Sequence, residues 1–295
     1  GMEQKKVTDD QKGAKKKMTK YTLECCVDSV ESALAAKEGG ADRLELCAGL
    51  IIGGVSPGLA LFEQVKACCD LPVRVLLRPR FGDFLYTDYE FRILRREVEL
   101  FRDAGAEGVV IGCLQEDGSL HMEQMRALTE AAGDLKITLH RAFDVCADPI
   151  RAYEQAWELG IDTILTSGQE SDCLAGLPLL KKLCSLQAES PGMGTEETGC
   201  DRQAEQPHGN AQSVQLQRAG KRPQIMAGAG VTPDVIRKFR AQTDITAFHL
   251  SAKKIIDSGM RYRKEGVPMG IPAMSEYSIF RTDREIVAQA REALA

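Results

Sequence analysis

Glu158-Leu-Gly-Ile-Asp162 ends one helical run and leads into the next β-rich run, and the same pattern occurs three times earlier in the chain. The earlier copies are Lys37-Glu-Gly-Gly-Ala-Asp42, Asp103-Ala-Gly-Ala-Glu107 and Ala131-Ala-Gly-Asp134. In each copy a glycine can adopt the left-handed conformation that ends a helix, and an acidic residue follows just before the next strand. The recurrence predicts repeated helix-to-strand turns at one rim of a parallel sheet.

Short β-rich runs alternate with amphipathic helical runs from residue 22 onward, which is typical of parallel strands joined by crossover helices. Eight such parallel units favour a closed (β/α)8 barrel of the TIM type. The alternative is an open doubly wound sheet, which usually has fewer strands. We expect a closing helix within Thr282 to Ala295. The predicted strands are Thr22 to Val27, Arg43 to Cys47, Val73 to Arg78, Gly108 to Gly112, Lys136 to His140, Thr163 to Leu165, Gln224 to Gly228 and Ile245 to Leu250.

Two segments break this rhythm. Residues 1–20 hold few apolar side chains and a basic cluster, and residues 188–221 are rich in Pro, Gly, Gln, Glu and Thr. Neither has the apolar content of a core. We therefore expect a disordered N-terminal lead-in at 1–20 and a single barrel domain at 21–295, with a flexible insertion at 188–221.

Composition excludes several classes of function. The formal net charge of -5 provides no broad basic field, so we expect no nucleic-acid partner. No run of about 18 apolar residues and no signal-type leader is found, so we expect no membrane partner and a cytoplasmic location. The ten cysteines are scattered over predicted strands and helices, as small buried residues in a reducing compartment would be.

Several charged residues fall on strand faces that should point into the barrel. Side chains alternate along a strand, and the outer face of a barrel must be apolar to pack against helices. A buried network that only specifies the fold would explain such residues. An active site would explain them too, because barrel sites form at the carboxyl ends of the strands. The candidate catalytic residues are Glu24, Glu45, His140, Asp144 and His249.

Other residues near the same strand ends suit an anionic ligand. The arginine fork matches a carboxylate or phosphate. Glycines after the seventh strand let backbone amides approach an anion at a helix start, although they could also serve the turn alone. The candidate ligand-binding residues are Arg78, Arg80, Arg141, Gly228, Gly230 and Ser251.

Cys26 and Cys47 end neighbouring strands on the inward face. Two thiolates this close could hold a soft ion such as Cu(I), so Cu(I) is the possible cofactor. The alternative is a pair of buried cysteines without a metal. Zinc is less favoured, because no compact four-ligand spacing occurs. His140 and His249 could add ligands if the barrel mouth brings them near.

The combined motifs resemble the CutC family, named for copper homeostasis, over residues 21–295 apart from the insertion. The resemblance implies a cytoplasmic (β/α)8 barrel, commonly a homo-oligomer, that binds Cu(I) through Cys26 and Cys47. Ile52-Gly-Gly-Val-Ser-Pro-Gly58 departs from the family pattern, in which glutamate commonly stands at the first position. The matching motifs are Cys26-Val-Asp-Ser-Val-Glu-Ser32, Gly39-Gly-Ala-Asp-Arg-Leu-Glu-Leu-Cys47, Arg78-Pro-Arg-Phe-Gly-Asp-Phe-Leu-Tyr86, His140-Arg-Ala-Phe-Asp144, Leu165-Thr-Ser-Gly-Gln-Glu170, Met260-Arg-Tyr-Arg263 and Glu276-Tyr277.

Two main functions remain open from the sequence. The first is a copper homeostasis protein that binds Cu(I) without turnover. The second is a barrel enzyme acting on a small anionic metabolite, phosphorylated or carboxylated, with the three arginines holding the anion and Glu24, Glu45 or His140 moving protons. A third interpretation is a protein-interaction role in which the barrel serves only as a scaffold. The internal charges argue against it.

Overall fold

The computed structural model describes residues 20–188, 220–271 and 274–295. The expected N-terminal lead-in, apart from Lys20, and the expected insertion, apart from residues 188, 220 and 221, lie outside the described residues.

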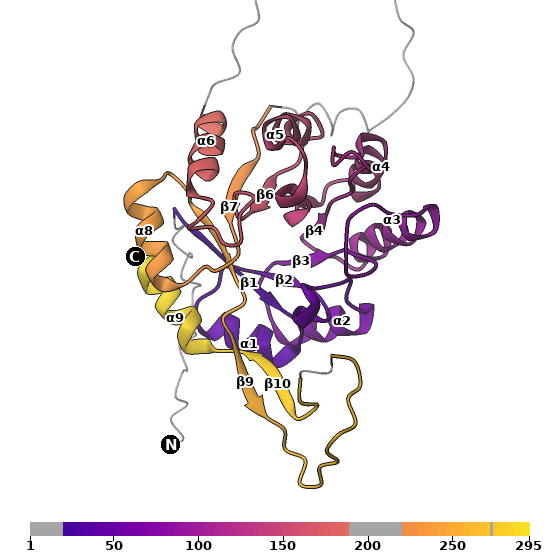
Figure 1. Ribbon diagram of the computed structural model, residues 1–295, viewed down its shortest axis with the longest axis vertical. Coiled ribbons are helices and arrows are strands. Elements are labelled where there is room, and N and C mark those ends of the chain that lie inside the picture. Colours follow the sequence, from indigo (N-terminus) through magenta and orange to yellow (C-terminus); the bar gives the residue numbers. More distant parts are fainter. Residues whose placement is uncertain (1–19, 189–219, 272–273) are drawn as a thin grey trace, which may run out of the picture.

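Eight parallel strands close into a barrel in sequence order, which confirms the predicted fold and excludes the open sheet (Figure 1). Seven of them begin at the predicted residue, and the eighth begins two residues later. The strands are β1 Thr22–Val27, β2 Arg43–Leu46, β3 Val73–Leu76, β4 Gly108–Ile111, β5 Lys136–Leu139, β6 Thr163–Thr166, β7 Gln224–Ala227 and β8 Ala247–Leu250.

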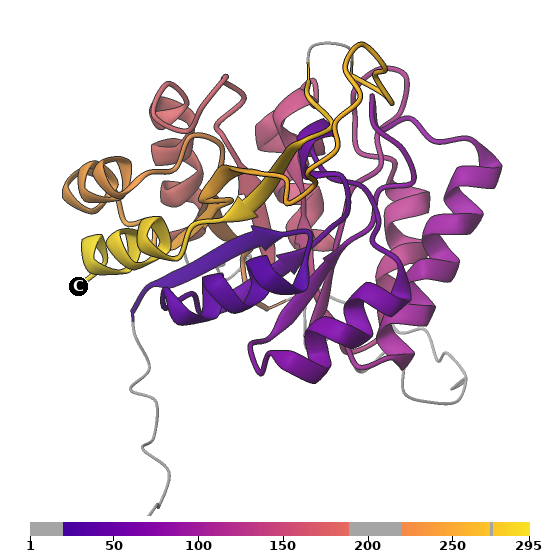
Figure 2. The same ribbon diagram turned by 90° about the horizontal axis from the view of Figure 1, so that it is seen from below.

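Helices surround the barrel on its outside (Figure 2). The expected closing helix is confirmed at α9, which starts after Asp283 because that carboxylate accepts a hydrogen bond from the Glu285 amide. The described α-helices are α1 Val30–Glu38, α2 Leu59–Cys68, α3 Asp88–Asp103, α4 Met122–Ala132, α5 Pro149–Glu158, α6 Leu177–Ala188, α8 Pro233–Gln242 and α9 Arg284–Ala293. Two 3-10 turns, η1 Leu50–Ile52 and η2 Arg141–Val145, follow β2 and β5.

The four predicted helix-to-strand turns each contain a glycine with positive φ, as expected. The acidic residue of the turn then ties neighbouring strands together. The Asp42 carboxylate accepts from the Leu23 amide at 2.8 Å, and that of Asp162 accepts from the Ile137 amide at 2.9 Å. These bonds hold neighbouring strands together at their amino-terminal ends. The loops that follow the strands lie at the opposite, carboxyl-terminal rim.

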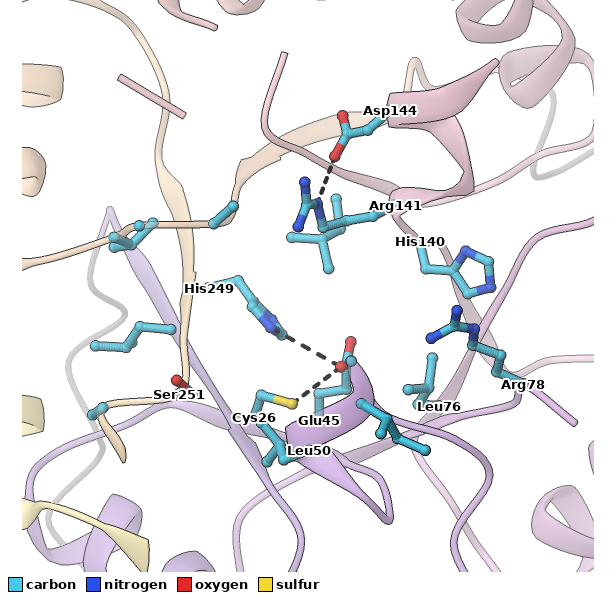
Figure 3. A pocket seen from close by; sticks show the side chains of 18 of the residues that line it. Cys26, Glu45, Leu50, Leu76, Arg78, His140, Arg141, Asp144, His249 and Ser251 are labelled. Carbon is cyan, nitrogen blue, oxygen red and sulfur yellow. Dashed lines mark hydrogen bonds and ion pairs between the residues drawn. The ribbon is translucent and has the colours of Figure 1, made fainter. Parts of the chain in front are cut away.

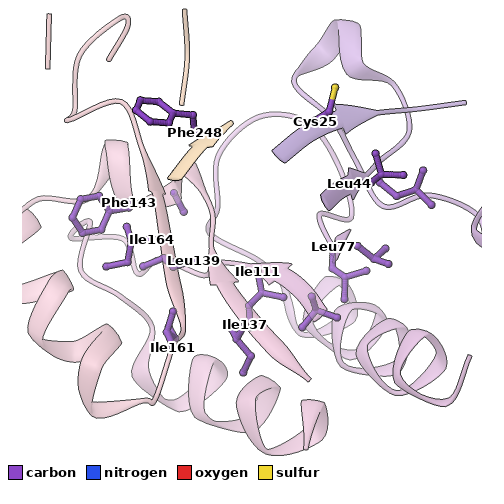
Figure 4. Packing of buried hydrophobic residues seen from close by; sticks show 14 of the residues in the cluster. Cys25, Leu44, Leu77, Ile111, Ile137, Leu139, Phe143, Ile161, Ile164 and Phe248 are labelled. Carbon is purple, nitrogen blue, oxygen red and sulfur yellow. The ribbon is translucent and has the colours of Figure 1, made fainter. Parts of the chain in front are cut away.

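Apolar side chains of the strands point outward and pack under the helices (Figure 4). On β1 the outward residues are Leu23, Cys25 and Val27, and all three are fully buried. Burial of a large aliphatic side chain contributes about 1.5–3 kcal/mol, so this shell is the main source of stability. The alternate residues face the interior, as the alternation predicts.

Arg74 occupies the interior near the amino ends of the strands. Its guanidinium donates to Glu107 at 2.9 Å and to the hydroxyls of Thr138 and Thr163 at 2.9 and 3.1 Å. We call these four residues the barrel floor. At this end the interior charge is matched by partners.

An antiparallel hairpin, β9 Lys253–Asp257 with β10 Ser278–Thr282, follows β8 and was not predicted. It lies beside α1 (Figure 1), where the Thr282 amide donates to the Ser32 hydroxyl at 3.0 Å. Its first strand has two lysines and two isoleucines in succession, so it lacks the alternation that marks a half-buried strand.

Candidate functional site

A cavity of about 590 Å³ opens at the carboxyl ends of the strands (Figure 3). Its walls come from the ends of β1, β2 and β8 and from the loops after β2, β3, β5 and β7. The predicted residues that line it are Cys26, Glu45, Arg78, His140, Arg141, Asp144, Gly230, His249 and Ser251. The predicted residues that do not line it are Glu24, Cys47, Arg80 and Gly228.

Cys26 and Cys47 form a buried pair at the bottom of the cavity. β1 and β2 pair with Cys26 opposite Glu45, which places Cys47 just past the end of β2. The two sulfurs are 3.7 Å apart. Cys26 lies on the cavity wall, whereas Cys47 is fully buried and its thiol is 3.6 Å from the Val27 carbonyl oxygen. An ion could therefore reach the pair only past Cys26.

His249 reaches the same place from β8, which pairs with β1 to close the barrel. Its Nδ1 is 2.8 Å from Oε1 of Glu24, and the other oxygen of Glu24 accepts from Arg43. With Nδ1–H donated to Glu24, the ring presents Nε2 to Glu45, 4.0 Å away. A carboxylate behind a histidine in this way is the usual support of a metal-binding imidazole.

Three potential ligand atoms, one each from Cys26, Glu45 and His249, all lie within 4.8 Å of one another. The Cys26 thiol donates to Oε1 of Glu45 at 3.4 Å. The second oxygen of Glu45 is buried and has no hydrogen-bond partner among the described residues. Of the two histidines considered as further ligands, the barrel brings only His249 into this group, because His140 lies across the cavity (Figure 3).

Protons are held tightly in this group. The hydrogen bond to Cys47 and burial raise the pKa of Cys26 well above its usual value, and burial raises the pKa of Glu45. Burial alone would lower the pKa of His249, but Glu45, Cys26 and Glu24 outweigh it and raise that pKa well above 6.5. Burial likewise opposes ionisation of Glu24, yet Arg43 and His249 lower its pKa. A bound metal would therefore have to displace protons.

Arg78 and His140 stand on the wall away from His249 (Figure 3). The Arg78 guanidinium donates to the carbonyl oxygens of Gly54 and Gly82, at 3.1 and 2.6 Å, and lies over the Phe84 ring. The His140 ring also contacts Phe84, and its Nδ1 accepts from the Ala142 amide at 3.1 Å. Burial and the Arg78 charge lower the pKa of His140 to about 3, so this imidazole is neutral.

The other two predicted arginines have carboxylate partners. Arg80 turns away from the cavity toward Asp83 and Glu90, at 2.9 and 2.7 Å, which corrects the expectation of three arginines around one ligand. Its partner Glu90 belongs to the capping box of α3, so the helix start fixes the direction of this side chain. Arg141 lines the cavity but pairs with Asp144 at 2.7 Å.

Asp144 uses its carboxylate to hold the loop after β6. It accepts from the Ser167 amide at 3.0 Å, from the Thr166 hydroxyl, and from Arg141. These donors hold the Asp144 carboxylate as a loop anchor at the cavity rim, and its candidate catalytic role stays a prediction.

The glycines after β7 divide between packing and the cavity. A Cβ on Gly228 would lie 2.5 Å from Leu165 Cδ1, so a side chain at this position would require the buried Leu165 to move. Gly230 has φ +70° and lines the cavity. Ser251 follows β8 and lines the cavity near His249.

Two supporting residues stand outside the lists of candidate residues. Arg43 alternates with Glu45 on the inward face, which was a usable signal, but its pairing with Glu24 depends on strand register. Phe84 supports both Arg78 and His140, and only the contact geometry reveals it.

No helix of the described segments combines the length and the apolar character needed to cross a bilayer.

Comparison with known proteins gives one family. A sequence profile described as the CutC family matches residues 21–193. The chain is 41% identical over 270 residues to a family protein CutC of Parabacteroides distasonis, covering 91% of this chain and 98% of the relative. It is 38% identical over 264 residues to the copper homeostasis protein cutC homolog of Homo sapiens, covering 89% and 85% of the two chains.

The fold has a counterpart among solved structures. A crystal structure of CutC from Streptococcus agalactiae superposes with a TM-score of 0.63 at 22% identity, covering 78% of this chain and 98% of that one. At that identity the likeness concerns the fold, and the sequence matches establish the kinship. The chain therefore belongs to the CutC family, and its relatives include proteins named for copper homeostasis.

Proposed function

We propose that this protein binds Cu(I) in the cytoplasm through the thiolates of Cys26 and Cys47, with Nε2 of His249 as a third ligand. The observation that carries the proposal is the 3.7 Å separation of the two sulfurs. Thiolate sulfur binds a first-row metal at about 2.3 Å, so two sulfurs on one ion lie at most about 4.6 Å apart. The pair needs only a small movement to share an ion.

The donor set suits a soft cation. Thiolates and imidazole favour Cu(I), whereas a carboxylate oxygen is a harder donor. Glu45 is then better placed as the acceptor of the Cys26 proton, because the Cys26 thiol already donates to it and its raised pKa favours the protonated form. Glu24 holds Nδ1 of the His249 ring, which leaves Nε2 on the side of Glu45, within the group that contains Cys26.

A reducing compartment fits the cysteines. All nine cysteines in the described part of the chain are free thiols. Free thiols that persist are typical of the cytoplasm, where disulfides are reduced. This supports the proposed location and the Cu(I) oxidation state.

Anaerobic titration against a chromophoric Cu(I) chelator tests the proposal. Cys26→Ala and Cys47→Ala should each weaken Cu(I) binding by more than about tenfold, as removal of a metal ligand does at least as much as removal of its support. Cys113→Ala is the matched control, because Cys113 is equally buried but packs in the outer core. Binding that is unchanged in the double variant Cys26→Ala/Cys47→Ala would refute the proposal.

The homo-oligomer implied by the family resemblance stays a prediction. Light scattering during size-exclusion chromatography measures the mass in solution directly. A monomer at all concentrations would contradict it.

A further inference from the structure

Arg78 carries a charge that no carboxylate neutralises among the described residues. Arg43 pairs with Glu24, Arg74 with Glu107, and Arg141 with Asp144. Arg78 has only the carbonyl oxygens of Gly54 and Gly82, and its Nε is buried with no acceptor in the described chain. A partly buried cation without a counter-ion is costly, and an anion would offset that cost.

The guanidinium is also held in one place. Two backbone carbonyls fix its NH1 and NH2 groups, and the Phe84 ring supports its face at 5.0 Å. Such a fixed fork loses little side-chain entropy when it binds an oxyanion. Burial lowers the pKa of Arg78, as expected for a cation partly removed from water.

The cavity around Arg78 has room for an organic molecule. Its volume of about 590 Å³ lies within the roughly 300–1,000 Å³ range of small-molecule pockets. Figure 3 shows the Arg78 and Arg141 guanidinium groups both turned to the interior of the cavity. The nearest imidazole, His140, is neutral and therefore does not compete for an anion.

We infer that the barrel mouth binds a small molecule bearing an oxyanion, a carboxylate or a phosphate, whose anionic group sits on Arg78 with Arg141 at the rim. The site is separate from the thiol pair, because Arg78 and His249 lie on different walls of the cavity (Figure 3). This inference does not rest on copper binding.

Calorimetric titration with inorganic phosphate and, separately, with succinate tests the inference and distinguishes the two oxyanions. At least one probe should bind saturably, and Arg78→Leu should weaken that binding by about tenfold or more, since it removes charge-assisted hydrogen bonds to the oxyanion. Arg80→Leu is the matched control from the same loop, because Arg80 pairs with Asp83 and Glu90 outside the cavity. The Arg80→Leu variant should bind the oxyanion probe as tightly as the wild type does.

Thermal unfolding checks that each variant is folded. If Arg78→Leu does not fold, Arg78→Lys and Arg141→Leu replace it, and both should weaken binding because each loses a guanidinium fork. Absence of saturable binding for both probes, or equal weakening by Arg80→Leu, would overturn the inference. Cys26→Ala should leave oxyanion binding intact and Arg78→Leu should leave Cu(I) binding intact, so failure of either proposal is visible separately.

Discussion

Charged side chains occupy both ends of the barrel interior, but the two ends differ in whether all of these charged groups have partners. At the floor, Arg74 has a carboxylate and two hydroxyls as partners. At the mouth, the Glu45 carboxylate keeps an unpartnered oxygen and Arg78 lacks a carboxylate among the described residues. Buried polar groups are normally satisfied, so the difference separates a structural network from a site that awaits a ligand.

The largest expected effect comes from the same substitution made at each end. Arg74→Leu leaves a partly buried Glu107 carboxylate and two buried hydroxyls without their donor, and should lower the free energy of unfolding by about 3–5 kcal/mol. Arg78→Leu breaks only two bonds to backbone carbonyls and should cost about 1–2 kcal/mol. Urea unfolding of both variants measures this, and equal losses would erase the distinction between floor and mouth.

A smaller effect is expected where the interior network supports the mouth. Glu24→Gln removes the charge that holds His249 Nδ1, and should weaken Cu(I) binding by about 10–100-fold while both thiols remain. The chelator competition described above measures it. Glu107→Gln at the floor is the control, because Glu107 contacts Arg74 and is remote from the sulfurs. An equal loss in the control would show a general effect on the fold.

The histidines of the mouth should give opposite pH dependences. The His140 pKa of about 3 lies below the unfolded value near 6.5, so its contribution to stability is complete above pH 6.5 and is lost as the pH falls toward 3. At pH 5 the loss should be about 2 kcal/mol. The His249 pKa is raised, so its contribution is complete below pH 6.5 and is lost as the pH rises through its folded value.

Urea unfolding at pH 7 and pH 5 separates these contributions. His140→Asn keeps an acceptor for the Ala142 amide and should show less destabilisation at pH 5 than the wild type. His249→Gln should not reduce that loss. If His140→Asn retains the full acid destabilisation, the neutral buried imidazole is not its cause.

The fold could be predicted because its signals are local. Alternation along β1 and β2 and the glycine-containing turns depend on neighbouring residues, and they placed the strands within one or two residues of their ends. The β9–β10 hairpin escaped because its strands are 20 residues apart and lack alternation. No pattern among neighbouring residues predicts a strand pairing of this kind.

The site could be predicted only as a set of candidates. Inward alternation placed Glu45 and Cys26 correctly, because it needs only the strand period. The contact of Glu24 with His249 requires the register of β1 against β8, whose residues are 225 positions apart. The direction of Arg80 depends on the start of α3, which the sequence of the loop alone does not determine.

Copper X-ray absorption on the Cu(I)-loaded protein tests the central claim most directly. We predict that the ion has two sulfur neighbours and one imidazole nitrogen, that Cys47→Ala leaves one sulfur, and that His249→Gln leaves two sulfurs without the imidazole. A spectrum with only nitrogen and oxygen neighbours, or one unchanged by Cys26→Ala, would contradict the account.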